Sequence, residues 1–134
     1  MKTEFELIKK GTHNNHCLAD KFGNRCVMTM RKSGNASIGT KLMEFFKWRG
    51  GSEALFAIND GKLYIADATN LEIMGLKVQT SNNKKESYRM SIGTVNKRMM
   101  NDGIFKDGIY ELLPVEVYDK KNKISFYELV HISQ

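Results

Sequence analysis

The tetrapeptide Ser-Ile-Gly-Thr occurs twice in this chain, at residues 37–40 and again at residues 91–94, a spacing of 54 residues. At the same spacing, the methionine pair 99–100 falls where the phenylalanine pair 45–46 stands. A fixed internal spacing is the sequence signature of a repeated structural unit. The repeat therefore predicts that much of the chain is one small unit written twice.

The first copy has a simple pattern of strand, strand and helix. Residues 27–30 (VMTM) predict a short strand, the turn at 33–35 (SGN) reverses the chain, and residues 36–38 return as a second strand. Thr40 is expected to be the N-cap of a helix, because its hydroxyl can accept a free N–H of the first turn. The helix of about three turns is expected to place three apolar side chains on one stripe, namely Leu42, Phe45 and Phe46.

A hairpin completes the first copy. Gly50 and Gly51 are expected to end the helix, because glycine adopts left-handed dihedrals without strain. Two apolar runs follow, at 55–58 and 63–66, and Asn59-Asp60-Gly61 joins them. Asp-Gly between two apolar runs predicts a tight β-turn with positive φ at both central positions.

The second copy repeats this order. Residues 78–80 predict a strand, 81–86 (SNNKKE) a polar loop, and 88–92 a return strand with alternating apolar side chains. Thr94 repeats the expected N-cap. The second copy therefore begins with the same strand, turn, strand and helix as the first.

The end of the second copy is longer. Residues 105–108 (FKDG) match residues 48–51 (WRGG) at a spacing of 57, which predicts a three-residue insertion after the second helix. The final hairpin is expected at 109–118 and 123–132, and its first strand contains Pro114. Proline cannot donate to a strand ladder, so an edge position or a bulge is predicted there.

These elements predict a mostly β protein with two short helices, built from duplicated ββαββ units. One unit is too small to cover its own helix and hairpin, whereas two related by a pseudo-two-fold axis can close their strands into one barrel. We expect a single packed domain made of residues 27–70 and 71–134. Residues 1–26 form an N-terminal extension, in which residues 4–9 are expected to add a strand.

The composition agrees with a soluble globular protein and favours a polyanionic partner. The formal net charge is +6 and the pI is about 9.3, which suits nucleic acid, although a charge of this size also serves solubility alone. The longest apolar runs are too short for a transmembrane helix. The N-terminal segment contains Glu4 and Glu6 and no long apolar run, so it is unlike a secretory signal. We therefore expect a cytoplasmic protein that does not bind a membrane.

One segment has the residue types of a zinc site. His13, His16, Cys17 and Cys26 could supply four nitrogen and sulfur ligands. The segment lacks the paired CxxC or HxxxH spacing that is typical of zinc sites, and two cysteines are too few for a disulfide framework. A solvated loop with reduced thiols is the preferred interpretation, so we expect no metal and no cofactor.

The stretch at 27–68 (VMTMRKSGNASIGTKLMEFFKWRGGSEALFAINDGKLYIADA) resembles the AbrB-like swapped-hairpin family of prokaryotic DNA-binding regulators, which includes MazE-type antitoxins. Gly39 stands where that family usually has a helix-starting proline, and Gly51-Ser52 stands at its Gly-Asp step. The resemblance covers about 100 residues and implies a swapped-hairpin barrel. Two chains usually form that barrel, so a tandem copy implies a single-chain pseudo-dimer or a homodimer. The related double-psi barrels leave the threading of the strands open.

The resemblance also implies contacts to duplex DNA from the first loop and the helix of each unit, and the two copies match this pattern unevenly. Copy one has basic residues in its loop, but Met43 and Glu44 occupy the usual basic positions of the helix. This asymmetry argues against binding to a palindromic operator. The predicted nucleic-acid-binding residues are Arg31, Lys32, Lys84, Lys85, Arg89, Lys97 and Arg98, of which the arginines are expected nearest to base edges.

Two other functions are weighed against DNA binding. A protein-interaction module, such as an antitoxin-like, phage or mobile-element protein that binds a host factor, would use the methionines as an adaptable surface or the last hairpin as an added strand. An enzyme is not expected, because no phosphate-binding loop, nucleophile elbow or zinc-protease motif is present. The sequence therefore predicts a non-enzymatic DNA-binding regulator.

Overall fold

The computed structural model describes residues 25–73, 75–80 and 88–132, and shows a mostly β protein with two helices in these ranges. The elements are β1 (Val27–Met30), β2 (Asn35–Ile38), α2 (Thr40–Phe46), β3 (Glu53–Asn59), β4 (Lys62–Asp67), β5 (Leu76–Lys77), β6 (Gln79–Thr80), β7 (Tyr88–Ser91), α3 (Gly93–Asn101), β8 (Gly108–Leu112), β9 (Val117–Asp119) and β10 (Ile124–His131). The strand predicted at residues 4–9 lies outside the described residues.

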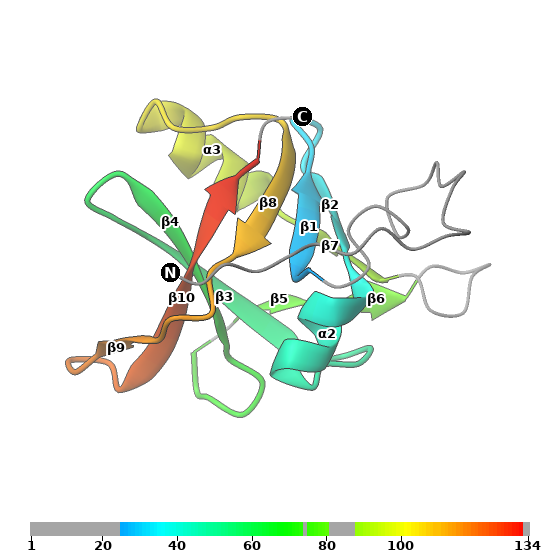
Figure 1. Cartoon of the computed structure of the whole chain (residues 1–134), viewed down its shortest axis with the longest axis vertical. Coiled ribbons are helices and arrows are strands. Elements are labelled where there is room, and N and C mark those ends of the chain that lie inside the picture. Colours follow the sequence, from blue (N-terminus) through cyan, green and yellow to red (C-terminus); the bar gives the residue numbers. More distant parts are fainter. Residues whose placement is uncertain (1–24, 74, 81–87, 133–134) are drawn as a thin grey trace, which may run out of the picture.

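The strands form an antiparallel sheet in the order β5-β3-β4-β10-β8-β1-β2-β7-β6, and β9 is added to β10. The two ends of this order, β5 and β6, are consecutive in the chain and are separated by Val78 alone. The N–H of Val78 donates to the carbonyl of Ser52 at 2.8 Å, and its own carbonyl accepts from the N–H of Gly51 at 2.9 Å. The sheet therefore returns on itself as a nearly closed, barrel-like structure (Figure 1).

Hairpins from the two halves of the chain alternate around the sheet. The β8–β10 hairpin lies between β4 and β1, and the β3–β4 hairpin lies between β10 and β5. Strand β2 pairs with β7, again across the two halves. Neither half therefore forms a sheet of its own, and both fold around one shared interior.

The interior is filled by side chains that alternate along the strands. Every second residue of β1 and β2 points inward, as the burial of Met28, Met30, Ala36 and Ile38 shows. Methionines are prominent, and their flexible side chains fill irregular gaps. The main core consists of Met28, Met30, Ala36, Ile38, Leu42, Met43, Trp48, Ala54, Leu63, Ile65, Val78, Met90, Ile92, Met99, Tyr110, Leu112 and Leu129.

The helices do not begin with the predicted threonine caps. Gly39 is the N-cap of α2 and Ile92 is the N-cap of α3, and neither helix has a side-chain cap hydrogen bond. Thr40 and Thr94 are already inside the helices, so their prediction as N-caps was wrong. The N–H of Gly39 donates to the carbonyl of Val27 at 2.9 Å, which ties the start of α2 to β1 in place of a side-chain cap.

The two helices differ in length. Helix α3 has nine residues against seven in α2, and one of the additional residues is at its start, where Gly93 lies 54 residues after Gly39, the N-cap of α2. Lys47 and Gly103, which follow the two helices with positive φ of 60° and 73°, are 56 residues apart. The three-residue insertion expected after the second helix stays a prediction. Neither helix of the described ranges has the length and apolarity to span a membrane.

The predicted apolar stripe of α2 is correct at Leu42 and at Phe46, which is half-buried against the core, and wrong at Phe45. Leu42 and its neighbour Met43 are buried, whereas Phe45 is 37% exposed. Phe45 and Phe46 join Tyr127 of β10 in an edge-to-face cluster, and Phe46 stacks on Trp48 with ring centroids 4.4 Å apart. Short α2 therefore packs through consecutive residues at its centre and through aromatic rings at its end.

Both predicted hairpins form, and the turn chemistry agrees with prediction in the first. Asp60 and Gly61 have φ of 56° and 75°, as the tight turn requires. In the second hairpin Leu112 pairs with Leu129 and Val117 with Phe126, so residues 113–116 stand opposite only two residues. This bulge contains Pro114, which confirms the predicted interruption of the ladder.

Candidate nucleic-acid interface

The outer face of β1, β2, β7 and β6 carries a row of polar side chains. Thr29 lies opposite Ser37, Ser37 opposite Arg89, and Arg89 opposite Gln79. Residues that are directly opposite in an antiparallel pair point to the same face, and their neighbour Met90 is buried in the interior. The row therefore faces outward, with Arg89 exposed near its centre.

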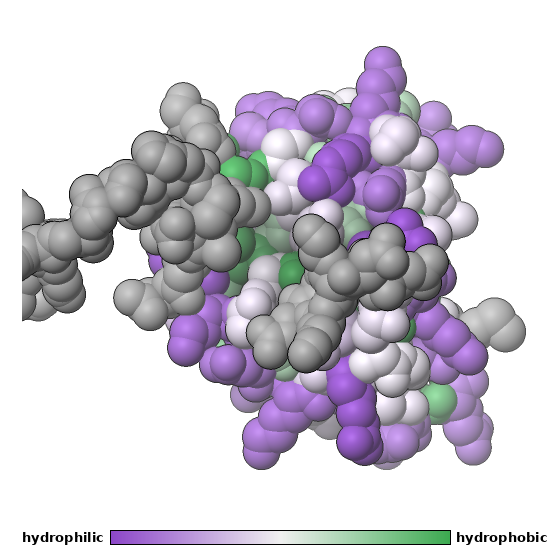
Figure 2. Space-filling view, turned by 90° about the vertical axis from the view of Figure 1, so that its right-hand side faces the viewer, coloured by the Kyte–Doolittle hydropathy of each residue, from purple (hydrophilic) through white to green (hydrophobic). Residues whose placement is uncertain are grey.

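Arg31 belongs to the same face. Its Nη1 donates a hydrogen bond of 3.0 Å to the hydroxyl of Ser37. Ser37 thus has the guanidinium group of Arg31 as a hydrogen-bond partner and Arg89 as its cross-strand neighbour. Figure 2 shows this side of the molecule, where hydrophilic side chains dominate the outer parts of the visible surface.

The turn between β1 and β2, residues 31–34, packs against the start of α3. The Nδ2 of Asn96 donates to the carbonyl of Arg31 at 2.8 Å, and the N–H of Ile92 donates to the carbonyl of Gly34 at 2.8 Å. Asn96 is only 3% exposed, and its Oδ1 has no hydrogen-bond partner among the described atoms. These bonds fix the loop of the first half to the helix of the second half, and both lie at the top of Figure 1.

Basic side chains surround this junction. Lys32, Lys97 and Arg98 are exposed, and the N–H of Lys32 donates to the Oδ1 of Asp107 at 2.6 Å. Arg98 lies 3.5 Å from the carboxylate of Asp102, one helical turn away. An exposed pair of this kind contributes little to stability, so Arg98 can exchange its partner at small cost.

The structure describes five of the seven predicted residues. Arg31 and Arg89 share the face of β2 and β7, while Lys32, Lys97 and Arg98 lie on the turn and helix that meet at Asn96. Lys84 and Lys85 lie outside the described residues. We call the five residues Arg31, Lys32, Arg89, Lys97 and Arg98 the basic interface.

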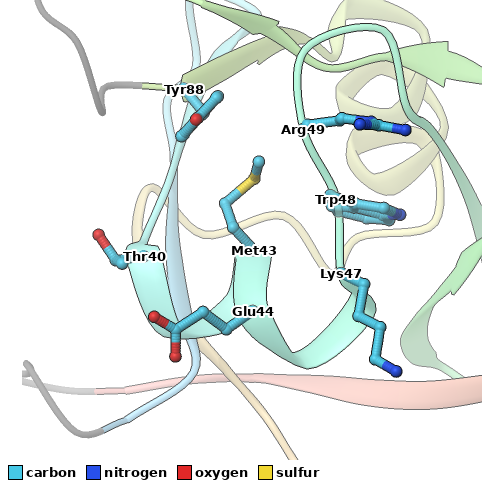
Figure 3. A pocket seen from close by; sticks show the side chains of 7 residues that line it. All are labelled: Thr40, Met43, Glu44, Lys47, Trp48, Arg49 and Tyr88. Atoms are coloured by element: carbon cyan, nitrogen blue, oxygen red, sulfur yellow. The ribbon is translucent and has the colours of Figure 1, made fainter.

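A second feature lies at the opposite end of the β2–β7 pair. A shallow pocket of about 600 Å³ is lined by Thr40, Met43, Glu44, Lys47, Trp48, Arg49 and Tyr88. In Figure 3 the Met43 side chain projects between Tyr88 and the segment 47–49, whereas the side chains of Lys47 and Arg49 point away from Tyr88. The pocket thus has an apolar floor and does not gather its ionisable groups around one point.

Lys47 and Arg49 were missed by the sequence analysis. Both are exposed, and neither side chain forms a hydrogen bond or ion pair within the described part of the chain. They flank the buried Trp48 in the stretch FFKWRG, where basic and aromatic residues alternate, and this pattern could have drawn attention to them. Met43 stands at a helix position that is commonly basic in the AbrB-like family, but in this chain it is a core residue.

Of the histidines and cysteines considered as zinc ligands, only Cys26 is among the described residues; His13, His16 and Cys17 lie outside them. Cys26 is half-buried, and its thiol donates to the carbonyl of Lys41 at 3.6 Å. Burial raises the pKa of this thiol, which keeps it protonated near neutral pH. Within the described ranges, no three histidine, cysteine, aspartate or glutamate side chains cluster as metal ligands would.

The fold and surface define a small antiparallel barrel-like protein with a basic interface at one end. No family model, no curated protein and no solved structure matches the chain.

Proposed function

We propose that this chain is a non-enzymatic duplex-DNA-binding protein that regulates transcription and is related to the AbrB-like swapped-hairpin regulators. The observation that carries the proposal is the junction at Asn96, which joins the basic loop of one half to the basic helix of the other. The alternation of hairpins around the sheet is what a swapped-hairpin barrel requires, and it supports the family resemblance.

The same proposal includes a duplication of one ββαββ unit. Ala36 pairs with Met90, and these residues are 54 positions apart, which is the spacing of the repeated tetrapeptide. A pseudo-two-fold axis that relates two copies would pass through such a pair. On either side of it, Asn35 pairs with Ser91, and Ser37 pairs with Arg89. Asn35 and Arg89 are again 54 positions apart, as are Ser37 and Ser91, so the same axis would convert one pair into the other.

The basic interface suits a phosphate backbone. Lysine and arginine side chains that neutralise phosphates release counterions, so affinity falls steeply with salt. Arg31 and Arg89 lie on a strand surface and have two-pronged guanidinium groups, which match the acceptors of a guanine edge. Arg31 is already oriented by Ser37, so less side-chain freedom is lost when it binds.

The test is fluorescence-anisotropy binding to a labelled random duplex at two salt concentrations. With six or more phosphate contacts, affinity should fall by about 10³-fold between about 50 and 200 mM salt. The double variant Lys97→Glu/Arg98→Glu should lose more than about tenfold in affinity at the lower concentration. Its matched control is Lys120→Glu/Lys121→Glu, which changes the net charge equally on the hairpin between β9 and β10.

The control should stay within about threefold of the unmodified protein, because charges beyond a Debye length are screened. Equal losses in both variants would mean that only net charge attracts the DNA, and would contradict an interface at α3. An absence of binding at about 50 mM salt, where phosphate contacts are strongest, would overturn the DNA-binding proposal altogether.

A second candidate function is a protein-interaction module that binds a host factor. The observation that favours it is a run of exposed apolar side chains near β9, with Val115 66%, Val117 44% and Tyr118 53% exposed. A contiguous exposed apolar patch is the kind of surface that a protein partner covers. This surface lies at the lower left of Figure 1, away from the basic interface, so the two functions do not exclude each other.

A further inference from the structure

Strand β9 has a free edge. It pairs with β10 along one side, through Val117 with Phe126 and Asp119 with Ile124, and no other strand of the described ranges pairs with it. An unpaired edge presents N–H and C=O groups that can form a ladder with another extended segment. The edge of β9 is therefore able to accept one more strand.

The direction of the free groups follows from the hairpin turn. The carbonyl of Asp119 accepts the N–H of Lys123 at 2.6 Å, so the polar backbone groups of Asp119 face β10. Successive residues of an antiparallel strand alternate the side on which they bond. The N–H and C=O of Tyr118 therefore point to the free edge.

A groove lies beside this edge. It has a volume of about 670 Å³ and runs between the β9–β10 turn and the outer face of the β3–β4 hairpin, where it is lined by Ala57, Tyr64, Val117, Tyr118 and Phe126 among others. Ile124 and Phe126 of β10 already pack on this outer face, against Ala66. An added strand at β9 would lie over the remaining half-buried apolar surface and enlarge that small core.

The charge around the groove selects the kind of strand that fits. Lys120 and Lys121 line it, and Lys123 lies on the same turn; none of the three forms an ion pair in the described part of the chain. The nearby carboxylates are already engaged, because Asp119 accepts N–H groups of the turn and Glu116 accepts the hydroxyl of Ser125. The groove therefore combines an apolar floor with a net positive charge, since Lys120 and Lys121 outnumber Asp119 among the charged residues that line it.

We propose that the β9 edge and this groove bind an extended peptide segment of a partner protein in which apolar and acidic residues alternate. The segment adds a strand to β9, places its apolar side chains against Tyr64 and Phe126, and directs its carboxylates to Lys120 and Lys121. Backbone bonds of this kind supply affinity, and the alternating side chains supply specificity. The inference names the partner class of the second candidate function and does not depend on DNA binding.

The test uses two fluorescein-labelled nine-residue peptides, one alternating Val with Glu and the other alternating Val with Lys. Fluorescence anisotropy should show at least about tenfold tighter binding of the Glu peptide, since like charges at an interface repel. Hydrogen exchange should show new protection at Tyr118 and its neighbours in the complex. Equal binding of both peptides, no binding of either, or protection confined to other strands would overturn the proposal.

Two variants separate the contributions of backbone and charge. Tyr118→Pro removes an N–H that points away from β10, so it should abolish peptide binding while the β9–β10 ladder persists. Lys120→Glu/Lys121→Glu leaves the backbone unchanged and should reverse the preference towards the Lys peptide. Lys97→Glu/Arg98→Glu should bind the Glu peptide as the unmodified protein does. Peptide binding that depends on Lys97 and Arg98 would contradict the proposed groove without deciding whether DNA binds.

Discussion

Each of the two helices begins within one copy of the repeated tetrapeptide, yet they are attached in different ways. Helix α2 is held by the buried Leu42 and Met43 and by the aromatic cluster at Phe46. Helix α3 buries Asn96 and Met99, and the side-chain amide of Asn96 donates a hydrogen bond of 2.8 Å to the carbonyl of Arg31. One helix is thus fixed mainly by apolar packing, and the other adds a directional polar contact to the opposite half.

This difference bears on function, because a helix that packs with consecutive apolar residues has less surface for charge. In α2, Met43 directly follows the buried Leu42 and is buried as well. In α3, Lys97 and Arg98 directly follow the buried Asn96 and are exposed. Each helix buries two residues, which are adjacent in α2 and three positions apart in α3. In α3 two exposed positions therefore stand between the buried ones, and both carry basic side chains.

The largest expected effect comes from the apolar anchors. Leu42→Ala should lower the free energy of unfolding by about 2–5 kcal/mol, because a buried side chain is removed and a cavity remains. Met99→Ala in α3 should cost a similar amount, since both residues are at most 1% exposed. Urea denaturation measures both, with the exposed Met100→Ala as control; a small loss for Leu42→Ala would mean that α2 is only loosely packed.

Removal of the polar anchor should have a smaller effect on stability and a specific effect on the interface. Asn96→Ala removes the side-chain hydrogen bond to the carbonyl of Arg31, which then keeps only the bond from the N–H of Gly34 at 2.9 Å, and it truncates a buried side chain. It should cost about 1–3 kcal/mol. The β1–β2 turn should then exchange its amide hydrogens faster than β3 and β4, as hydrogen exchange would show. If protection in the turn is unchanged, α3 does not hold it in place.

The loops after the helices offer a matched comparison. The N–H of Arg49 donates to the hydroxyl of Ser52 at 3.0 Å, and the N–H of Lys106, 57 residues later, donates to the hydroxyl of Tyr110 at 3.1 Å. Ser52→Ala should cost about 1 kcal/mol, because it removes one hydrogen bond. Tyr110→Phe should cost more, about 1–2 kcal/mol, because the Tyr110 hydroxyl also donates to the carbonyl of Lys106 at 2.6 Å. Thermal unfolding measures both; equal losses would show that the second bond of Tyr110 adds nothing to stability.

The smallest effect is expected in the turn of the second hairpin. The hydrogen bond from the Asn122 side chain is the main reason why the pKa of Asp119 lies below its usual range. Asp119 therefore stabilises the folded state above its unfolded pKa of about 3.9, and this contribution is lost as the pH falls through the lower folded value. Asp119→Ala should destabilise the hairpin at pH 7 and have little effect at about pH 2, when both forms are compared by urea denaturation. A destabilisation that is the same at both pH values would exclude the carboxylate as the cause.

Local signals in the sequence were sufficient for most elements. The strand of residues 27–30, the turn of Asp60 and Gly61, and the interruption at Pro114 each follow from the preferences of adjacent residues. The predictions failed where a local preference competed with packing. Thr40 is a good N-cap in isolation, but the bond from Gly39 to Val27 starts the helix one residue earlier.

The candidate site was predictable in its residue types and not in its geometry. Arginine and lysine at 31, 32, 97 and 98 were visible as basic pairs, whereas the contact that joins them runs through Asn96, which no charge pattern singles out. The groove at β9 could not be found from sequence, because it lies between hairpins from different halves.

The sequence by itself determined where the chain turns and which residues alternate, because those properties depend on steric limits and periodicity within a few residues. Only the tertiary structure decided that the hairpins alternate around one sheet, that Met43 is buried while Phe45 lies at the surface, and that Asn96 meets Arg31. These outcomes depend on which distant surfaces cover each other best, and that choice is made by the packing of the whole chain.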